Sequence, residues 1–279
     1  MGRVDAHLHI WQRPVEYSWL SDELAPINRS ISAAEARAAS KRFGCERAVL
    51  VQAADTDADT EFMLALAERH DWIVGVVGWV PIEKPDAVRA RLAELAGRPL
   101  VGIRALVHDQ PDAQLLDAEP VRESLRVIAG HGLAFDVPDA YPHQLPAATR
   151  LARDLPELTV VLDHMGKPPA ADREGWEAAV RAFAALPNTA AKLSGLHHGG
   201  KALPAHAQRQ VWDLGLEHFG PARLMLGSDF PMPLLGDGIE VLADASEELL
   251  AALTAAEREA IELATATRIY GLEASRPRA

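Results

Sequence analysis

Cysteine is the scarcest informative residue in this sequence. The chain of 279 residues contains one cysteine, Cys45, which excludes an intramolecular disulfide and a metal cluster held by several thiolates. Such usage is typical of a reducing compartment. The first expected strand begins by Val4, which leaves no room for a signal peptide. We therefore expect a cytoplasmic protein.

Basic residues are also in short supply. The 28 lysines and arginines face 40 aspartates and glutamates, which gives a formal net charge of -12. This balance argues against nucleic acid, which needs a basic face, and disfavours an anionic membrane surface. No apolar run approaches the ~20 residues of a membrane-spanning helix. The expected partner is a small-molecule substrate, and the oligomeric state is left open.

Three further absences reduce the number of possible folds. No glycine-rich phosphate fingerprint follows any expected strand, which argues against an open, doubly wound, nucleotide-binding sheet. The sequence has no linker rich in Gly, Ser or Pro and no low-complexity segment. With 48% hydrophobic residues, the chain is typical of globular proteins. We expect residues 1–279 to form one domain.

The apolar runs that are present alternate with helical patterns. They lack clean polar alternation, as expected for parallel strands that are covered on both faces. The pattern predicts an α/β fold, a single (β/α)8 TIM barrel with an extra C-terminal helix, and a small subdomain within the loop at 11–31 is an open alternative. The eight expected strands cover residues 4–9, 47–52, 73–80, 100–106, 133–137, 158–163, 188–194 and 223–228.

Residues able to carry chemistry gather at the carboxyl ends of these strands, where (β/α)8 barrels place their active sites. His7 and His9 are two positions apart on the first strand, so their side chains point the same way. Paired imidazoles can bind a polar substrate or a metal such as zinc. The other strand-end residues are Trp79, Arg104, His108, Asp163, His164, Lys192, Ser194, His197, His198 and Asp229.

Several of these residues also have an ordinary structural interpretation. Arg104 alone could be an ion-pair partner inside the barrel, and Lys192 could stabilise a neighbouring carboxylate. His164 could bond a backbone carbonyl, and Asp229 could cap a short helix. Lys167 fits a solvated loop lysine. Their common placement at one end of the barrel nevertheless favours a functional site.

Five segments carry a family resemblance. They are Val4-Asp-Ala-His-Leu-His9, Val101-Gly-Ile-Arg104, Leu162-Asp-His-Met-Gly-Lys-Pro168, Lys192-Leu-Ser-Gly195 and Gly227-Ser-Asp-Phe-Pro231. In this order they span almost the whole chain. The sequence resembles the amidohydrolase superfamily (amidohydrolase-2 type). More narrowly, it resembles the metal-dependent hydrolase branch that contains sugar and dicarboxylate lactonases.

The resemblance implies a role for each matching residue. His7, His9 and Asp229 would be metal ligands, and Asp229 would also serve as the general base. His164 would contact the substrate or the hydrolytic water. Arg104 would bind a substrate carboxylate or hydroxyl groups. The remaining expected substrate-binding residues are Trp79, Lys192 and His197.

This sequence departs from the family pattern at two strands. Many superfamily members add a histidine at strand five or a carboxylated lysine at strand four, where this chain has Phe135-Asp136 and Arg104. A binuclear site is therefore not expected. Two alternatives remain for the cofactor, namely one divalent metal, with zinc the best match, or a metal-independent site.

Lactone hydrolysis needs an activated water, a polarised carbonyl and a stabilised oxyanion. A carboxylate base can take the proton of the water, and a metal or hydrogen-bond donors can stabilise the oxyanion. The resemblance implies a lactonase that opens a sugar-acid or dicarboxylate lactone, and the residues at the strand ends could supply this chemistry. The alternatives are a metal-dependent decarboxylase of an aromatic or related carboxylic acid and a non-catalytic small-molecule-binding barrel.

Overall fold

The structure is a computed structural model that describes residues 2–12, 17–110 and 112–272. Two predictions extend beyond the described residues. The predicted first loop at 11–31 includes positions 13–16, and the predicted domain at 1–279 includes residues at both ends of the chain. The described strands confirm the predicted barrel. Eight parallel strands follow one another around the sheet in chain order. They are β1 (Arg3–Leu8), β2 (Cys45–Val51), β3 (Ile73–Gly78), β4 (Leu100–Arg104), β5 (Ala134–Val137), β6 (Val160–Leu162), β7 (Thr189–Leu193) and β10 (Leu224–Leu226).

Backbone contacts between the first strand and the segment after β10 close the barrel. Leu8 forms a parallel bridge with Phe230. The Asp229 amide donates to the His7 carbonyl at 2.9 Å, and the His9 amide donates to the Phe230 carbonyl at 2.8 Å. The closure therefore lies at the same residues that carry the expected chemistry.

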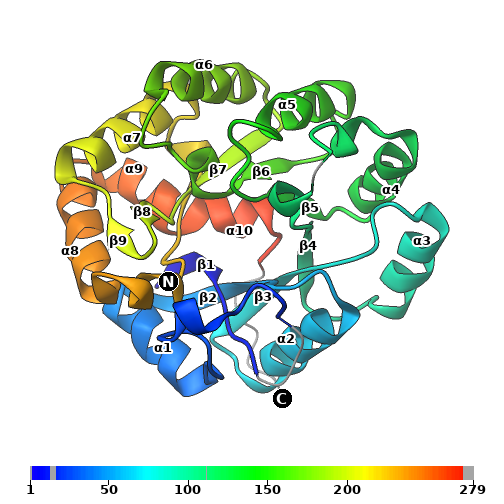
Figure 1. The fold of residues 1–279 in the computed structure, drawn as a ribbon, viewed down its shortest axis with the longest axis horizontal. Helices are drawn as coiled ribbons and strands as arrows, with labels where there is room; N and C mark the ends of the chain where they lie inside the picture. Colours follow the sequence, from blue (N-terminus) through cyan, green and yellow to red (C-terminus); the bar gives the residue numbers. More distant parts are fainter. Residues whose placement is uncertain (1, 13–16, 111, 273–279) are drawn as a thin grey trace.

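Helices form a ring around the strands (Figure 1). Their apolar faces pack on the outer side of the sheet, whereas the barrel interior holds small residues such as Val4, Val49 and Ala190. The helices of the ring are α1 (Ala33–Arg42), α2 (Asp57–Arg69), α3 (Pro85–Glu94), α4 (Glu119–Gly130), α5 (Leu145–Asp154), α6 (Arg173–Ala184), α7 (Ala205–His218) and α8 (Gly238–Leu250). No described helix is long and apolar enough to cross a membrane.

The expected C-terminal helix is present and covers one end of the barrel. It consists of α9 (Ala255–Glu259), the π-helical η7 (Ala260–Ala264) and α10 (Thr265–Ile269). Ile269 and Tyr270 pack against the interior residues of the strands, and Figure 1 shows α10 lying across the barrel. Among the described residues, the C-terminal helix therefore covers the interior at this end of the barrel.

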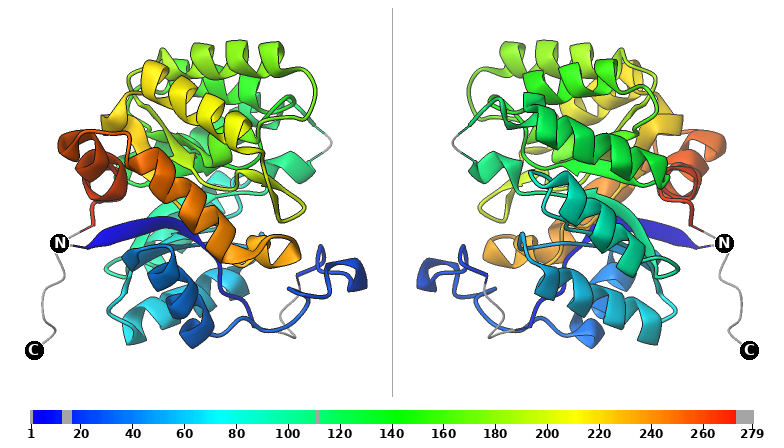
Figure 2. Two further views of the ribbon diagram at one scale, coloured as in Figure 1. Left: turned by 90° about the vertical axis from the view of Figure 1, so that its left-hand side faces the viewer. Right: turned by 90° about the vertical axis from the view of Figure 1, so that its right-hand side faces the viewer.

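The loops at the carboxyl ends of the strands carry the remaining short elements. In Figure 2 the first loop projects on the side of the molecule opposite to α10 and the start of β1. Among residues 17–31 the structure describes only the short helix η1, which does not support the alternative of a subdomain there. The short elements are η1 (Asp22–Leu24), η2 (Val107–Asp109), η3 (Leu115–Asp117), η4 (Asp163–Gly166), η5 (Pro221–Arg223), η6 (Met232–Leu235), β8 (His197–His198) and β9 (Lys201–Ala202).

Candidate active site

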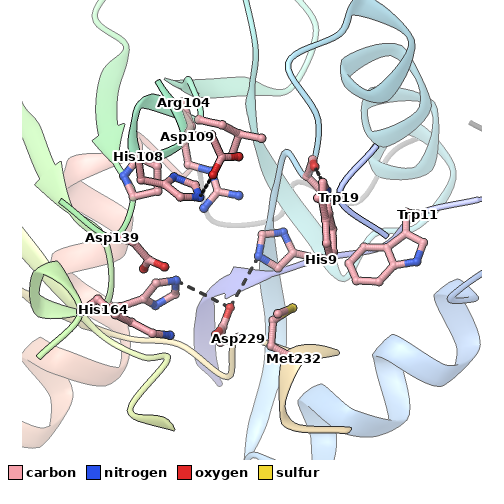
Figure 3. A pocket seen from close by; sticks show the side chains of 14 residues that line it. His9, Trp11, Trp19, Arg104, His108, Asp109, Asp139, His164, Asp229 and Met232 are labelled. Atoms are coloured by element: carbon pink, nitrogen blue, oxygen red, sulfur yellow. Dashed lines mark hydrogen bonds and ion pairs between the residues drawn. The ribbon is translucent and has the colours of Figure 1, made fainter. Parts of the chain in front are cut away.

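A pocket of about 210 Å³ opens at the carboxyl ends of the strands. Figure 3 shows His9 and Asp229 between two walls, with His108, Asp139 and His164 on one side and the indoles of Trp11 and Trp19 on the other. The residues that line it are His9, Trp11, Trp19, Ala53, Arg104, Leu106, His108, Asp109, Pro138, Asp139, His164, Lys167, Asp229 and Met232.

Asp229 is the centre of a cluster of imidazoles. Its Oδ1 lies 3.7 Å from Nε2 of His7, 3.6 Å from Nε2 of His9 and 3.7 Å from Nε2 of His164. Its Oδ2 lies 2.9 Å from Nε2 of His197. The barrel thus brings together the four residues that the sequence placed at the ends of strands one, six and eight.

The backbone at this cluster adopts conformations that are rare for residues with side chains. His164 and Asp229 both have φ of 55°, in the left-handed region where a side chain normally costs energy. Strand β6 consequently ends at Leu162, one residue earlier than the sequence pattern suggested, and η4 follows. This turn aims His164 across the barrel mouth, toward Asp229.

Two glycines of the sequence motifs make room for the histidines. A Cβ atom on Gly195 would lie 2.4 Å from Nδ1 of His164, and one on Gly227 would lie 2.8 Å from Cβ of His7. Such separations are far below van der Waals contact. Gly195 and Gly227 are therefore required by close packing against the site.

We expect Gly195→Ala to lower kcat by about 10²-fold, because the new methyl group displaces the His164 ring by a large fraction of an ångström. Gly199→Ala is a matched control: both glycines have positive φ, but a Cβ on Gly199 meets nothing within 4 Å. Steady-state kinetics and thermal melting of both variants make the comparison. Equal losses of kcat would attribute the effect to backbone strain and not to His164.

A network of buried charges lies beneath the pocket, inside the barrel. Lys192 Nζ contacts Asp136 Oδ2 at 2.6 Å and Asp163 Oδ1 at 3.0 Å. Arg104 Nη1 contacts Asp163 Oδ2 at 3.1 Å. Two cations therefore balance two carboxylates, which is how proteins accommodate charges away from water.

The expectation that Arg104 binds a substrate carboxylate or hydroxyl groups stays a prediction, and its contacts within the protein bear on it. Arg104 lines the pocket, but Nη1 donates to Asp163 and Nη2 donates to the Gln52 carbonyl. Its two terminal nitrogens are therefore engaged within the protein. Arg104 is thus an ion-pair partner inside the barrel, but a guanidinium has five N–H donors and its Nε has no hydrogen-bond partner, so it can still donate to a ligand.

Three other expected substrate-binding residues do not line the pocket. Lys192 has no exposed surface and lies below it. Trp79 follows the end of β3 and lines a separate cavity beside Pro81 and Ile82. His197 is 3% exposed and bonds to Asp229, so it orients the carboxylate. Strand-end position alone does not distinguish pocket walls from supporting residues.

The aromatic wall was missed because it comes from the first loop. Trp19 donates from Nε1 to the Ala53 carbonyl at 2.7 Å, and the Trp11 and Trp19 rings meet edge-on at 5.3 Å. Tyr17 fastens the same loop through a 2.5 Å hydrogen bond to Asp59. The signal available in the sequence was the concentration of aromatic residues in a long loop.

Two charged residues of the opposite wall were also missed. Lys167 lines the pocket and donates to the Gly195 carbonyl at 3.3 Å, so it is not merely a solvated loop residue. Asp139 lines the pocket with φ of 39°, and its Oδ1 is buried without a hydrogen-bond partner. An unsatisfied acceptor at this position is suited to a ligand hydroxyl.

The surroundings set the protonation of the central groups. Burial opposes ionisation of Asp229, but the nearby His164 and the hydrogen bond from His197 outweigh it and hold the pKa well below its usual range. Burial lowers the pKa of His164 and lowers that of His7 strongly. At neutral pH the site therefore contains the Asp229 carboxylate facing the neutral imidazoles of His7 and His164.

The positions of His7, His9 and Asp229 suit one divalent metal, because their ligand atoms lie within 4.8 Å of one another. His9 has the hydrogen bond typical of a metal-binding histidine, from Nδ1 to the Val51 carbonyl at 2.8 Å. His7 Nδ1 instead lies 3.1 Å from the Lys192 ammonium and 3.4 Å from Asp163 Oδ1. Only the aspartate could accept a proton from His7 in a metal-bound state.

Comparisons with known proteins agree with this fold. The family model described as Amidohydrolase matches residues 4–272. The L-fucono-1,5-lactonase of Burkholderia ambifaria is 35% identical over 84% of this chain and 81% of its own length. The L-fucono-1,5-lactonase of Burkholderia multivorans is 32% identical over 97% and 96%.

A solved amidohydrolase from Burkholderia multivorans with bound zinc is similar in structure, with a TM-score of 0.89 and 31% identity, covering 97% of this chain and 99% of that one. The family model, the sequence similarity and the structural similarity thus indicate the same family as the motifs of the sequence. The chain belongs to the amidohydrolase family.

Proposed function

We propose that this protein is a lactonase that hydrolyses the cyclic ester of a sugar acid. The observation that carries the proposal is the Asp229 carboxylate, which faces three imidazole Nε2 atoms within 3.7 Å at the base of an aromatic-walled pocket. The similarity of this chain to two L-fucono-1,5-lactonases supports a sugar lactone as the substrate class.

Asp229 acts as the general base in this proposal. The carboxylate accepts a proton from water as the water oxygen attacks the lactone carbonyl. Because its pKa is low, Asp229 is ionised but weakly basic, so attack also requires a polarised carbonyl. Imidazole N–H groups of the surrounding histidines can donate to the developing oxyanion.

The second half of the reaction returns the proton. When the tetrahedral intermediate collapses, the ring C–O bond breaks and the ring oxygen leaves as an alkoxide. Protonated Asp229 donates to this oxygen, which regenerates the carboxylate. The product is a hydroxy acid, ionised at neutral pH, and a reactive ester of this kind needs no strong Lewis acid.

A divalent metal, if it binds, would be held by His7, His9 and Asp229, and zinc is the ion we propose for that set. When bound, it would polarise the lactone carbonyl or the water.

The pocket walls favour a neutral, hydroxyl-bearing lactone over a dicarboxylate. Asp109 and Asp139 add two carboxylates to the lining beside Asp229, against Lys167 and the engaged Arg104. A doubly charged anion would meet repulsion there, whereas hydroxyl groups can donate to the carboxylates. The indoles of the first loop provide a flat apolar surface for the ring.

A panel of lactones read with a pH indicator tests the proposed function. The panel contains six-membered sugar lactones, unsubstituted δ-valerolactone and a pyrone dicarboxylate, with an aromatic acid for decarboxylation. Acid release from the sugar lactones is the expected result. Proton consumption with the aromatic acid would favour the decarboxylase, and no turnover of any compound would favour a binding protein.

The decarboxylase alternative lacks a ligand at strand five. Asp136 occupies that strand, and its carboxylate is bonded to Lys192 and Tyr270 beneath the pocket. It is therefore not available to a metal at the mouth. We also propose that the chain acts in the cytoplasm as one domain, in keeping with its single cysteine and its closed barrel.

We expect Asp139→Ala to raise KM for a sugar lactone by about tenfold, because one hydroxyl loses its acceptor, which is worth about 1.5 kcal/mol. δ-Valerolactone, which has no hydroxyl groups, should show an unchanged KM and is the internal control. Steady-state kinetics on both substrates measures the difference. Equal changes for both lactones would show that Asp139 shapes the pocket and does not recognise hydroxyls.

A further inference from the structure

We infer that Lys192 is a positioning residue that fixes the hydrogen-bond direction of His7, so that His7 Nε2 carries the proton and donates into the active site. Lys192 Nζ lies 3.1 Å from His7 Nδ1. An ammonium group has hydrogens and no lone pair, so it can only donate. His7 Nδ1 must therefore be the acceptor in this contact.

The environment of Lys192 favours a hydrogen bond from its ammonium to His7. The ammonium donates to Asp136 Oδ2 at 2.6 Å and lies 3.1 Å from His7 Nδ1, and it forms an ion pair with Asp163 Oδ1 at 3.0 Å that is not a hydrogen bond. Its side chain is completely buried, so water cannot replace a lost partner. Withdrawing the His7 contact would leave a buried N–H unsatisfied, which is costly.

The contact of Nε2, on the other side of the His7 ring, independently indicates that Nε2 carries the proton. His9 Nδ1 lies 2.8 Å from the Val51 carbonyl, an acceptor only, so the neutral tautomer of His9 that fits this contact has its proton on Nδ1 and a lone pair on Nε2. That Nε2 lies 3.1 Å from His7 Nε2. A proton on His7 Nε2 completes this hydrogen bond, whereas two facing lone pairs would repel.

The competing tautomer of His7, with the proton on Nδ1, is the one that metal binding requires. There His7 Nδ1–H would donate to Asp163 Oδ1, 3.4 Å away, and the Nε2 lone pair would face the site. Arg104 Nη1 could reach that lone pair only at 3.5 Å. His7 is neutral in both arrangements, so the difference is in the position of one proton. Lys192 favours the donor form and thereby opposes metal binding.

Two measurements test the role of Lys192. Long-range ¹H–¹⁵N NMR of imidazoles reports which nitrogen is protonated, with His7 assigned by loss of its signals in His7→Gln. We expect Nε2–H in the wild-type protein and Nδ1–H in Lys192→Met. Zinc affinity, measured by competition with a chromophoric chelator, should tighten by about 10–100-fold in Lys192→Met, the usual scale for the hydrogen-bond partners of ligands.

Lys167→Met is the matched control. It removes the same charge from the pocket wall without touching His7, since Lys167 bonds to the Gly195 carbonyl. An equal gain in zinc affinity in this variant would mean that charge alone acts, and the inference would be wrong. Nδ1–H in wild-type His7, or unchanged or weaker zinc binding in Lys192→Met, would also overturn it.

Lys192→Met leaves Asp136 with one partner fewer, so folding must be checked by circular dichroism. If the single variant does not fold, Asp136→Asn with Lys192→Met removes one charge of each sign and is measured in its place. The wild-type NMR measurement needs no variant and decides the His7 tautomer on its own. None of these readouts depends on the substrate, so they are separate from the test of the lactonase.

Discussion

Replacement of Asp229 by asparagine is expected to lower kcat for lactone hydrolysis by about 10²–10⁴-fold, the usual value of general-base assistance. The amide keeps the shape of the side chain and can still meet His197 at Oδ1, but it cannot accept the proton of the water. It also removes the negative charge that faces three imidazoles within 3.7 Å.

Steady-state kinetics on the best lactone of the panel measures this effect. Asp244→Asn is the matched control, because Asp244 pairs with Arg42 on the surface, with 69% of its side chain exposed. The control should keep wild-type kcat. Wild-type turnover in pure Asp229→Asn would remove Asp229 from the role of base, and the histidines would have to supply it.

Replacement of Arg104 by methionine is expected to destabilise the protein by about 3–5 kcal/mol, the usual cost of breaking a buried ion pair. The change leaves Asp163 Oδ2 without its partner at 3.1 Å and the Gln52 carbonyl without its donor. Charge balance among the two cations and two carboxylates is lost. Denaturant unfolding gives the free energy directly.

Two further variants show whether the loss comes from the buried charge. Arg104→Met with Asp163→Asn restores neutrality and should recover most of the stability, as a double-mutant cycle would reveal. Arg42→Met removes an arginine from an exposed pair and should cost less than about 1 kcal/mol. A small loss in Arg104→Met would mean that water or Lys192 neutralises Asp163, contrary to the network described above.

Much of the fold could be predicted from residue patterns, because the period of apolar residues reflects burial directly. The eight barrel strands and the ring helices were predicted, whereas the short strands β8 and β9 were not, and the motifs at the strand ends identified His7, His9, His164 and Asp229. Each of these residues lies within or directly after a segment whose apolar pattern clearly predicts a strand. A barrel then brings them together automatically, since parallel strands end at one mouth.

Supporting residues could not be distinguished from pocket walls in the same way. Lys192, His197 and Trp79 follow or end strands just as His164 does, yet the structure places the first two behind other groups and the third at another cavity. The direction of a side chain at a strand end depends on where the strand stops. The end of the strand is set by residues with positive φ angles and by close contacts. Neither of these can be predicted well from the residue types alone.

The sequence by itself determined the strand and helix order, the acidic charge, the single cysteine and the histidine and aspartate residues at the barrel mouth, because these follow from local periodicity and residue chemistry. Only the tertiary structure decided that Arg104 and Lys192 neutralise Asp136 and Asp163, that Trp11 and Trp19 form a wall, and that Lys192 faces His7. The physical reason is that such contacts join residues up to 185 positions apart. Their energies depend on distance and burial, which no local pattern specifies.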